Sequence, residues 1–240
     1  MIDLHHVVTP NGHKVKIMLE ETALPYKIIQ YNLLEGTHLK PEFRQINPNG
    51  RLPALVDHDP IGGGPSMAVF DSGAMLFYLA EKSGRFFGSS PRTRHLAMQW
   101  LMWQMSGLGP MHGQAHHFIR YCPEDIPYAV NRYMNESRRL LEVLDRRLRE
   151  ADYLAEEYSI ADMAVWPWIR AIKPVGIELG DYPNLQRWYE RVGARPAVEA
   201  GARLPEGHWM TQTAQSKVKL TEEQWSNLFG ENMLKSGRAT

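Results

Sequence analysis

The sequence has only one cysteine, Cys122, among its 240 residues. A single cysteine excludes a disulfide framework within the chain. It also excludes a Cys-x-x-Cys redox pair, and the first turn of the chain reads Thr-Pro-Asn-Gly, at residues 9–12. We interpret Cys122, which precedes a proline, as an inert small residue rather than a nucleophile. Any sulfur chemistry must therefore use the thiol of a ligand.

The chain also has no excess charge of either sign. Lysine plus arginine and aspartate plus glutamate both number 27, so no positive field favours nucleic acid or an anionic membrane surface as a partner. No apolar run approaches the ~20 residues of a membrane-spanning helix, and residues 1–6 do not read as the start of a secretory signal. We therefore expect a cytoplasmic protein. With 43% apolar residues, the chain can form a core in each of two compact parts.

The first part of the chain alternates short apolar runs with turn residues. Residues 2–8 are rich in β-branched side chains, and the turn at 9–12 separates them from apolar residues at helical spacing over 15–21. Proline cannot donate to a strand ladder, so Pro53 belongs at a strand end or a special turn, where cis bonds occur. This order predicts a small α/β domain whose ligand surface lies where the first turn, Pro53 and the last helix start meet. Further strands are predicted at 26–33, 51–57 and 68–70, and further helices at 41–46 and 74–82.

The second part of the chain shows long helical patterns. Ser90 followed by Pro91 is typical of an N-cap with proline at the first helical position. Ser159 and Asp162 have the spacing of a capping box and predict the start of a buried helix. Helices are predicted at 94–118, with a bend at its glycines and proline, at 127–149, and from 183 and 196 onward. The predicted domains are 1–86 (α/β), 87–93 (linker), 94–206 (all-helical) and 207–240 (a tail packed on the surface or partly disordered).

Five separated motifs follow one another along the chain. They read Thr-Pro-Asn-Gly, Asn-Pro-Asn-Gly-Arg-Leu-Pro-Ala-Leu-Val-Asp, Phe-Asp-Ser-Gly-Ala, Trp-Gln-Met-Ser-Gly-Leu-Gly-Pro-Met and Tyr-Ser-Ile-Ala-Asp. In this order they resemble the cytosolic glutathione transferases, most closely the bacterial nu class, over residues 1–203. The resemblance implies a thioredoxin-like N-terminal domain, an all-helical C-terminal domain and a homodimer. It also implies glutathione or glutathione disulfide as the ligand, with no metal.

The first turn must then make the thiol of glutathione reactive. A free thiol has a pKa near ~8.5, so little of it is thiolate at neutral pH. Lowering that pKa by about two units requires about 2.7 kcal/mol. A helix N-terminus contributes up to ~2 kcal/mol, and a hydrogen bond to a charged group contributes roughly 1.5–3 kcal/mol. Because Thr9 offers a hydroxyl and Asn11 offers a side-chain amide and a backbone N–H, we expect both to be catalytic, with Asn11 also binding glutathione.

Four residues are expected to hold the rest of the tripeptide. Leu52 can pair its backbone with the cysteinyl part as a neighbouring strand would, and the resemblance implies a cis peptide bond at Pro53. Ser72, with its N–H, is expected to bind the γ-glutamyl carboxylate, while Asp71 faces the ammonium.

Two further positions come from the resemblance alone. His38 lies where nu-class proteins place a polar glutathione contact, often a glutamine. Arg132 matches a family arginine that reaches bound glutathione or its disulfide, in its own subunit or in the partner's, and a guanidinium suits a carboxylate. Taken singly, Thr9 and Asp71 are helix caps and Arg132 is a solvated helix charge. Their agreement in one sequence favours a glutathione site.

The histidines offer a metal alternative. His112 and His116 are four residues apart, and His117 is adjacent, so two of them could share a helix face as zinc ligands do. No carboxylate lies between the first two, and Gly113 weakens the helix. We therefore favour His112 and His116 as residues that line the cleft between domains.

Three functions remain open at this point. The nu-class resemblance favours glutathione-dependent reduction of small disulfides, with weak conjugation. The alternative enzyme conjugates glutathione to small electrophiles in an apolar second site, which Trp103, Met111 and Phe118 would line. The third function is a non-catalytic glutathione-binding or scaffold protein, and the completeness of the predicted site argues against it.

Overall fold

The computed structural model describes residues 1–205 and 217–237. Its N-terminal part is a four-stranded sheet with helices, and the strand order is β2-β1-β3-β4. Strands β1 and β2 are parallel, with Ile2 opposite Tyr26, and the other two pairs are antiparallel. The elements are β1 (Ile2–His6), α1 (Pro10–Thr22), β2 (Tyr26–Gln30), η1 (Thr37–Leu39), α2 (Pro41–Ile46), β3 (Ala54–Asp57), β4 (Met67–Phe70) and α3 (Ser72–Ser83).

The C-terminal part is helical, as the sequence predicted. It contains two π-helical turns, η2 and η3, and the first of them falls where glycines and a proline follow one another. The expected helix over 94–118 is therefore a chain of shorter segments that begins at Pro91. The elements are α4 (Pro91–Trp103), η2 (Gln104–Leu108), α5 (Gly109–His116), η3 (His117–Tyr121), α6 (Pro127–Glu150), α7 (Ile160–Ile169), η4 (Lys173–Val175), η5 (Leu179–Asp181), α8 (Pro183–Gly193) and α9 (Pro196–Gly201).

Local capping explains where the central helix α7 begins. Ser159 is its N-cap, and the Asp162 carboxylate accepts from the Ser159 N–H at 3.0 Å, which confirms the predicted capping box. The same carboxylate accepts from the backbone N–H of Leu154 at 3.1 Å and from Trp188 Nε1 at 2.8 Å. A buried carboxylate with several donors ties α7 to α8 and to the loop before it.

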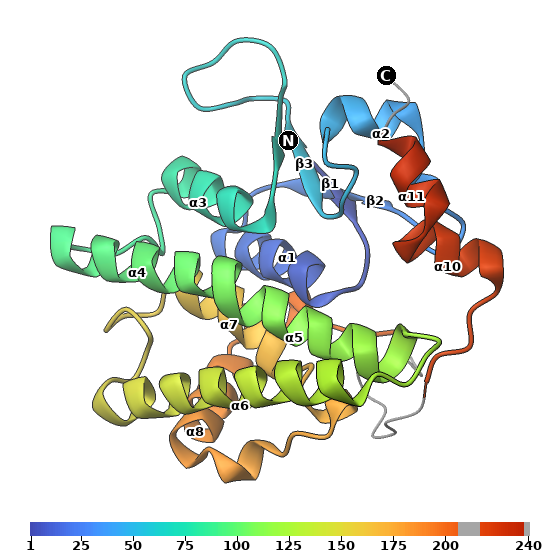
Figure 1. The fold of residues 1–240 in the computed structure, drawn as a ribbon. Coiled ribbons are helices and arrows are strands. Elements are labelled where there is room, and N and C mark those ends of the chain that lie inside the picture. The colour runs from blue at the N-terminus through green and yellow to red at the C-terminus, as the bar shows by residue number, and fades with distance from the viewer. Residues whose placement is uncertain (206–216, 238–240) are drawn as a thin grey trace.

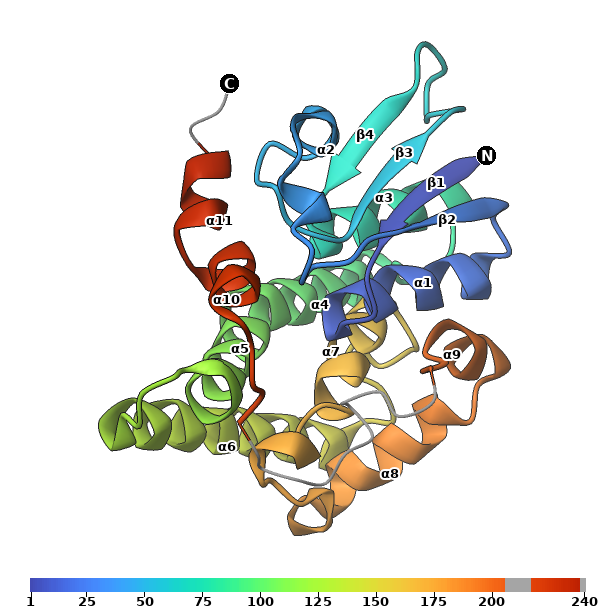
Figure 2. The same ribbon diagram turned by 90° about the vertical axis from the view of Figure 1, so that its right-hand side faces the viewer.

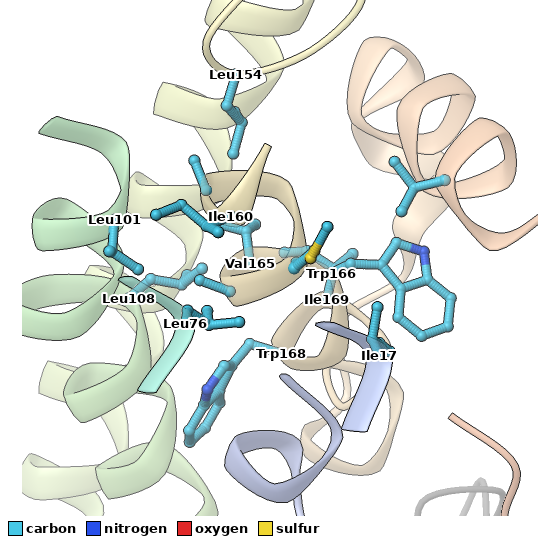
Figure 3. Close-up of a cluster of buried hydrophobic side chains, with 14 of the residues drawn as sticks. Ile17, Leu76, Leu101, Leu108, Leu154, Ile160, Val165, Trp166, Trp168 and Ile169 are labelled. Carbon is cyan, nitrogen blue, oxygen red and sulfur yellow. The ribbon is translucent and has the colours of Figure 1, made fainter. Parts of the chain in front are cut away.

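The two parts share a hydrophobic core. Helices α1 and α3 lie between the sheet and the helical part, whereas α2 lies away from that contact (Figure 1). Ile17 of α1 and Leu76 of α3 meet side chains of α7 in the cluster that Figure 3 shows. At the edge of this contact Arg195 forms two hydrogen bonds, of 2.6 and 2.9 Å, with the Glu21 carboxylate. The relative placement of the two parts is thus fixed by packing and by a bidentate ion pair.

The tail contains two helices in its described portion, α10 (Glu222–Phe229) and α11 (Glu231–Ser236). Both lie beside the N-terminal part near α2 (Figure 2). Asn227 donates to the carbonyl of Leu34 at 2.9 Å, and Arg44 donates to Ser236 Oγ at 2.8 Å. The described part of the tail, residues 217–237, is packed on the surface, as one of the two sequence expectations had it. The other residues of the expected tail, including Trp209, lie outside the described residues. In residues 1–205 and 217–237, no helix is both long and apolar enough to cross a membrane.

Candidate active site

A cavity of about 380 Å³ opens where β1 turns into α1. The first turn, the loop before β3, the helical part and the tail all contribute to its walls. Four residues that the sequence analysis assigned to the site, Thr9, Asn11, His38 and Leu52, come together here. The lining residues are Val7, Thr9, Pro10, Asn11, Leu33, His38, Arg51, Leu52, Gly113, His116, Tyr121, Trp168, Leu228 and Phe229.

Thr9 and Asn11 present hydrogen-bond donors at the start of α1. Thr9 is the N-cap, and its Oγ1 accepts from the Gly12 N–H at 3.2 Å, so its hydroxyl hydrogen stays available to another acceptor. Asn11 Oδ1 accepts from Trp168 Nε1 at 3.1 Å, which leaves the Nδ2 amide hydrogens as donors. The backbone N–H of Asn11 belongs to the first helical turn, whose amides have no partner within the helix. These donors and the helix dipole together suit an anion such as a thiolate.

His38 is a neutral polar group in the wall of the cavity. Burial, with the nearby Arg51 and Arg44, lowers its pKa to about 4, so the imidazole is uncharged at neutral pH. It is 2% exposed, and its Nδ1 has no hydrogen-bond partner among the described residues. A buried imidazole nitrogen without a partner is open to a ligand.

The backbone of Leu52 is also open. The Leu52–Pro53 peptide bond is cis, as the resemblance implied. No group of residues 1–205 or 217–237 hydrogen-bonds the amide or the carbonyl of Leu52, which precedes the first paired residue of β3. An extended peptide ligand can therefore take both groups as a strand would.

Asp71 and Ser72 mark the start of α3 outside this cavity. Asp71 is the N-cap with φ at +69°, an unusual backbone conformation for a residue with a side chain, and its Oδ1 accepts from the Gly73 N–H at 3.0 Å. Ser72 is the first residue of α3 and is buried. The helix start offers N–H groups to a carboxylate, as the sequence analysis expected, but neither residue lines the cavity beside Thr9.

Other predicted residues lie elsewhere. Arg132 is on α6, 59% exposed, and its nearest carboxylate is Glu136 at 3.9 Å. It does not line the cavity. Trp103, Met111 and Phe118, which were expected to line an apolar second site, do not line this cavity either. Phe118 instead stacks on Tyr133, with ring centroids 5.5 Å apart.

The histidines of α5 have separate roles. His112 is fully buried and does not line the cavity, which corrects the expectation that it would. His116 does line it, and its Nε2 lies 2.9 Å from the carbonyl oxygen of Ala171. Burial lowers the pKa of His112 to about 3 and that of His116 to about 4. Within the described part of the chain, no three His, Cys, Asp or Glu side chains come together as a metal site requires.

Several lining residues had escaped the sequence analysis. Trp168 is a core residue of α7 by its pattern (Figure 3). Nothing local in the sequence indicates that its indole N–H reaches Asn11. Leu228 and Phe229 belong to α10, in the expected tail. The ring of Phe229 lies 4.7 Å from that of His117 and 5.5 Å from that of Tyr121, between centroids. Of these rings, Tyr121 and Phe229 line the cavity.

The family models match both parts of the chain. The N-terminal domain of glutathione S-transferase matches residues 1–81, and the C-terminal domain matches residues 127–191. The "Disulfide-bond oxidoreductase YfcG" of Escherichia coli is 49% identical over 199 residues, which are 82% of this chain and 93% of that protein. The chain belongs to the glutathione S-transferase family. A second relative of this transferase, "Disulfide-bond oxidoreductase YghU" of Escherichia coli, is 39% identical over 83% of the chain and 73% of its own length.

Solved structures of other transferases share the fold. A glutathione transferase from Pseudomonas putida, with one glutathione disulfide bound per subunit, superposes with a TM-score of 0.80 at 41% identity, covering 85% of this chain and 91% of that one. A transferase from Burkholderia graminis, with two glutathione molecules bound per subunit, superposes with a TM-score of 0.80 at 39% identity, covering 86% and 89%. The thioredoxin-like and all-helical parts predicted from the sequence are those of this family.

Proposed function

We propose that this glutathione transferase reduces small disulfides with the thiolate of bound glutathione. The observation that carries the proposal is the set of donors on Thr9 and Asn11, which converge on a cavity that contains no thiol of the chain. Cys122 is buried outside the cavity lining. Relatives named as disulfide-bond oxidoreductases, and a family structure with bound glutathione disulfide, support the same chemistry.

The reaction consists of two thiol–disulfide exchanges. The first glutathione thiolate attacks one sulfur of the disulfide, a mixed disulfide forms, and the other half leaves as a thiolate that takes a proton from solvent. A second glutathione thiolate then attacks the glutathione sulfur of the mixed disulfide. Glutathione disulfide forms, and the second half of the substrate leaves as a thiol. Two glutathione molecules supply the two electrons, so the protein needs only to lower the thiol pKa and align the sulfurs.

The remaining site residues hold the tripeptide in this proposal. The backbone of Leu52 pairs with the cysteinyl part beside cis-Pro53, and His38 contacts the glycyl end. Ser72 and the first N–H groups of α3 bind the γ-glutamyl carboxylate, and Asp71 binds its ammonium. Arg132 does not line this cavity, so we assign it to the glutathione of a partner subunit in a homodimer. We place this enzyme in the nu class and in the cytoplasm.

Conjugation is the second candidate reaction. The apolar wall of Leu33, Leu228 and Phe229 suits a small electrophile that the same thiolate could attack. Both reactions can be measured on one sample. We expect rapid turnover of 2-hydroxyethyl disulfide with glutathione, coupled to glutathione reductase, and slow conjugation of an aryl halide.

The two rates decide between the functions. The reverse ranking would make the protein a conjugating transferase, and binding of glutathione without either activity would make it a binding or scaffold protein. A Thr9→Ala/Asn11→Ala double variant is expected to lose most of the reductase activity. Full activity in that variant would contradict the proposed role of the first turn.

A further inference from the structure

Lys14 is a buried cation to which the mechanism above gives no task. Lys14 lies on α1, one turn after Asn11, and is 1% exposed. Its Nζ donates to Gln104 Oε1 at 2.6 Å, to Ser72 Oγ at 3.3 Å and to Met105 Sδ at 3.3 Å. All three hydrogens of the ammonium thus have an acceptor, but none of these acceptors carries a charge.

A buried ammonium whose hydrogen-bond acceptors are all uncharged is costly to the fold. Burial lowers the pKa of Lys14 from 10.5 to about 7, and Asp71 offsets part of this effect. Asp71 is thus the charged group that acts on the pKa of Lys14. The three groups that accept from the Lys14 ammonium leave its charge without a hydrogen-bonded anion.

The contact with Ser72 shows where that charge would act. Because Ser72 Oγ accepts from Lys14, the hydroxyl hydrogen of Ser72 must point elsewhere. Within the described residues it donates to Met105 Sδ, at the long distance of 3.9 Å. A carboxylate at the start of α3 is a far stronger acceptor than a thioether. Its arrival would draw the Ser72 hydrogen outward and place a negative charge close to Lys14.

We propose that Lys14 is a positioning residue for the glutamyl end of glutathione, acting through Ser72 on the α-carboxylate. The ammonium polarises the hydroxyl and fixes its orientation, and Gln104 of the helical part holds the ammonium in place. This inference rests on the proposed glutathione site. In this proposal the Lys14 ammonium acts on the ligand without contacting it. Its hydrogen bonds to Ser72 and Gln104 connect α1 with α3 and η2.

Binding of the carboxylate should raise the pKa of Lys14. The bound protein then holds the proton to a higher pH than the free protein, so binding takes up protons near pH 7.5. The contribution of the Lys14 ammonium to the affinity for the ligand is fully present below the pKa of Lys14 in the free protein. It is lost as the pH rises through the pKa of Lys14 in the bound protein. S-methylglutathione is the suitable probe, because it has no thiol that ionises in the same range.

The experiment is titration calorimetry with S-methylglutathione and with its analogue that lacks the α-carboxylate, S-methyl-(4-aminobutanoyl)cysteinylglycine. We expect Lys14→Met to weaken the binding of S-methylglutathione about tenfold at pH 6.5 and to leave the binding of the analogue unchanged. Lys27→Met, which removes a charge from an exposed position on β2, should change neither. Proton uptake, measured on the unaltered protein in buffers of different ionisation enthalpy, should occur with the first ligand only.

The outcomes separate the two proposals. If Lys14→Met weakens the binding of both ligands equally, the proposed role of Lys14 is wrong and the glutathione site stands. The same holds if the unaltered protein binds S-methylglutathione without proton uptake. If the unaltered protein does not bind S-methylglutathione, the proposed function and this inference fail together. The proton-uptake measurement needs no variant, so the inference remains testable even where Lys14→Met does not fold.

Discussion

Trp168 and Asn11 are 157 residues apart in the sequence, and the indole N–H of Trp168 donates a 3.1 Å hydrogen bond to Asn11 Oδ1. The donor belongs to the core helix α7, and the acceptor belongs to the proposed thiolate site. It fixes the orientation of the Asn11 amide, because the oxygen must face the indole and the Nδ2 group must face away. The helical part therefore helps to orient a donor of the N-terminal part.

Replacement of Trp168 by phenylalanine should remove the hydrogen bond to Asn11 while keeping an aromatic ring in the core. Trp168→Phe removes the N–H, frees the Asn11 amide to rotate, and should lower kcat for disulfide reduction roughly five- to tenfold. The matched control is Trp166→Phe on the same helix, whose indole donates to the carbonyl of Tyr189 at 2.9 Å, far from the first turn. Equal losses of activity in the two variants would mean that the Trp168–Asn11 bond has no specific role.

A second prediction concerns the source of the reactive sulfur. If the thiolate belongs to bound glutathione, Cys122→Ala should retain full reductase activity, because Cys122 is buried and does not line the cavity. Loss of activity in Cys122→Ala would point to a nucleophile of the chain instead.

A third prediction concerns the Thr9 hydroxyl. Thr9→Ala should raise the pKa of the bound glutathione thiol by about one unit, which corresponds to about 1.4 kcal/mol. The thiolate absorbance of bound glutathione, followed against pH, measures this shift.

The sequence could predict most of the elements, because their signals are local. Ser90 and Pro91, or Ser159 and Asp162, define helix starts within four residues, and both starts are confirmed. The run of glycines and a proline after Met105 indicated a bend, but only the structure resolves it as a π-helical turn. Within the site, Thr9, Asn11, His38 and Leu52 were predicted and line one cavity.

The missing parts of the site depend on contacts between distant segments. Trp168 and Gln104 read as ordinary helix residues, and only the packing of the two parts brings them to Asn11 and Lys14. Phe229 lies beyond the segment that resembles the family, so no motif could assign it. A periodic pattern predicts which face of a helix is buried, but it does not predict which distant partner that face meets.

The buried histidines should make the protein sensitive to acid. Burial lowers the pKa of His112 to about 3 and that of His13 to about 3, whereas an unfolded histidine titrates at 6.5. Between these values the unfolded state binds more protons, so the stability present above pH 6.5 is lost as the pH falls. His112→Leu should shift the midpoint of acid unfolding, followed by circular dichroism, to lower pH. His95→Leu, an exposed position on α4, should leave it in place, and an unshifted midpoint in His112→Leu would contradict this account.

The tail should set the size of the disulfide that the site accepts. Phe229 lines the cavity and packs against His117 and Tyr121, so Phe229→Ala should enlarge the cavity on its outer side. We expect KM for 2-hydroxyethyl disulfide to rise about threefold to tenfold, because contacts with a small substrate are lost, and turnover of a bulkier aromatic disulfide to improve.

Leu234→Ala on α11 is the control for this prediction, because that side chain is 55% exposed and does not line the cavity. It removes apolar surface from the same part of the tail and should leave both KM values unchanged. A change of KM in Leu234→Ala equal to that in Phe229→Ala would mean that the tail acts by general stabilisation. Unchanged selectivity in Phe229→Ala would mean that the wall built by α10 does not contact the substrate.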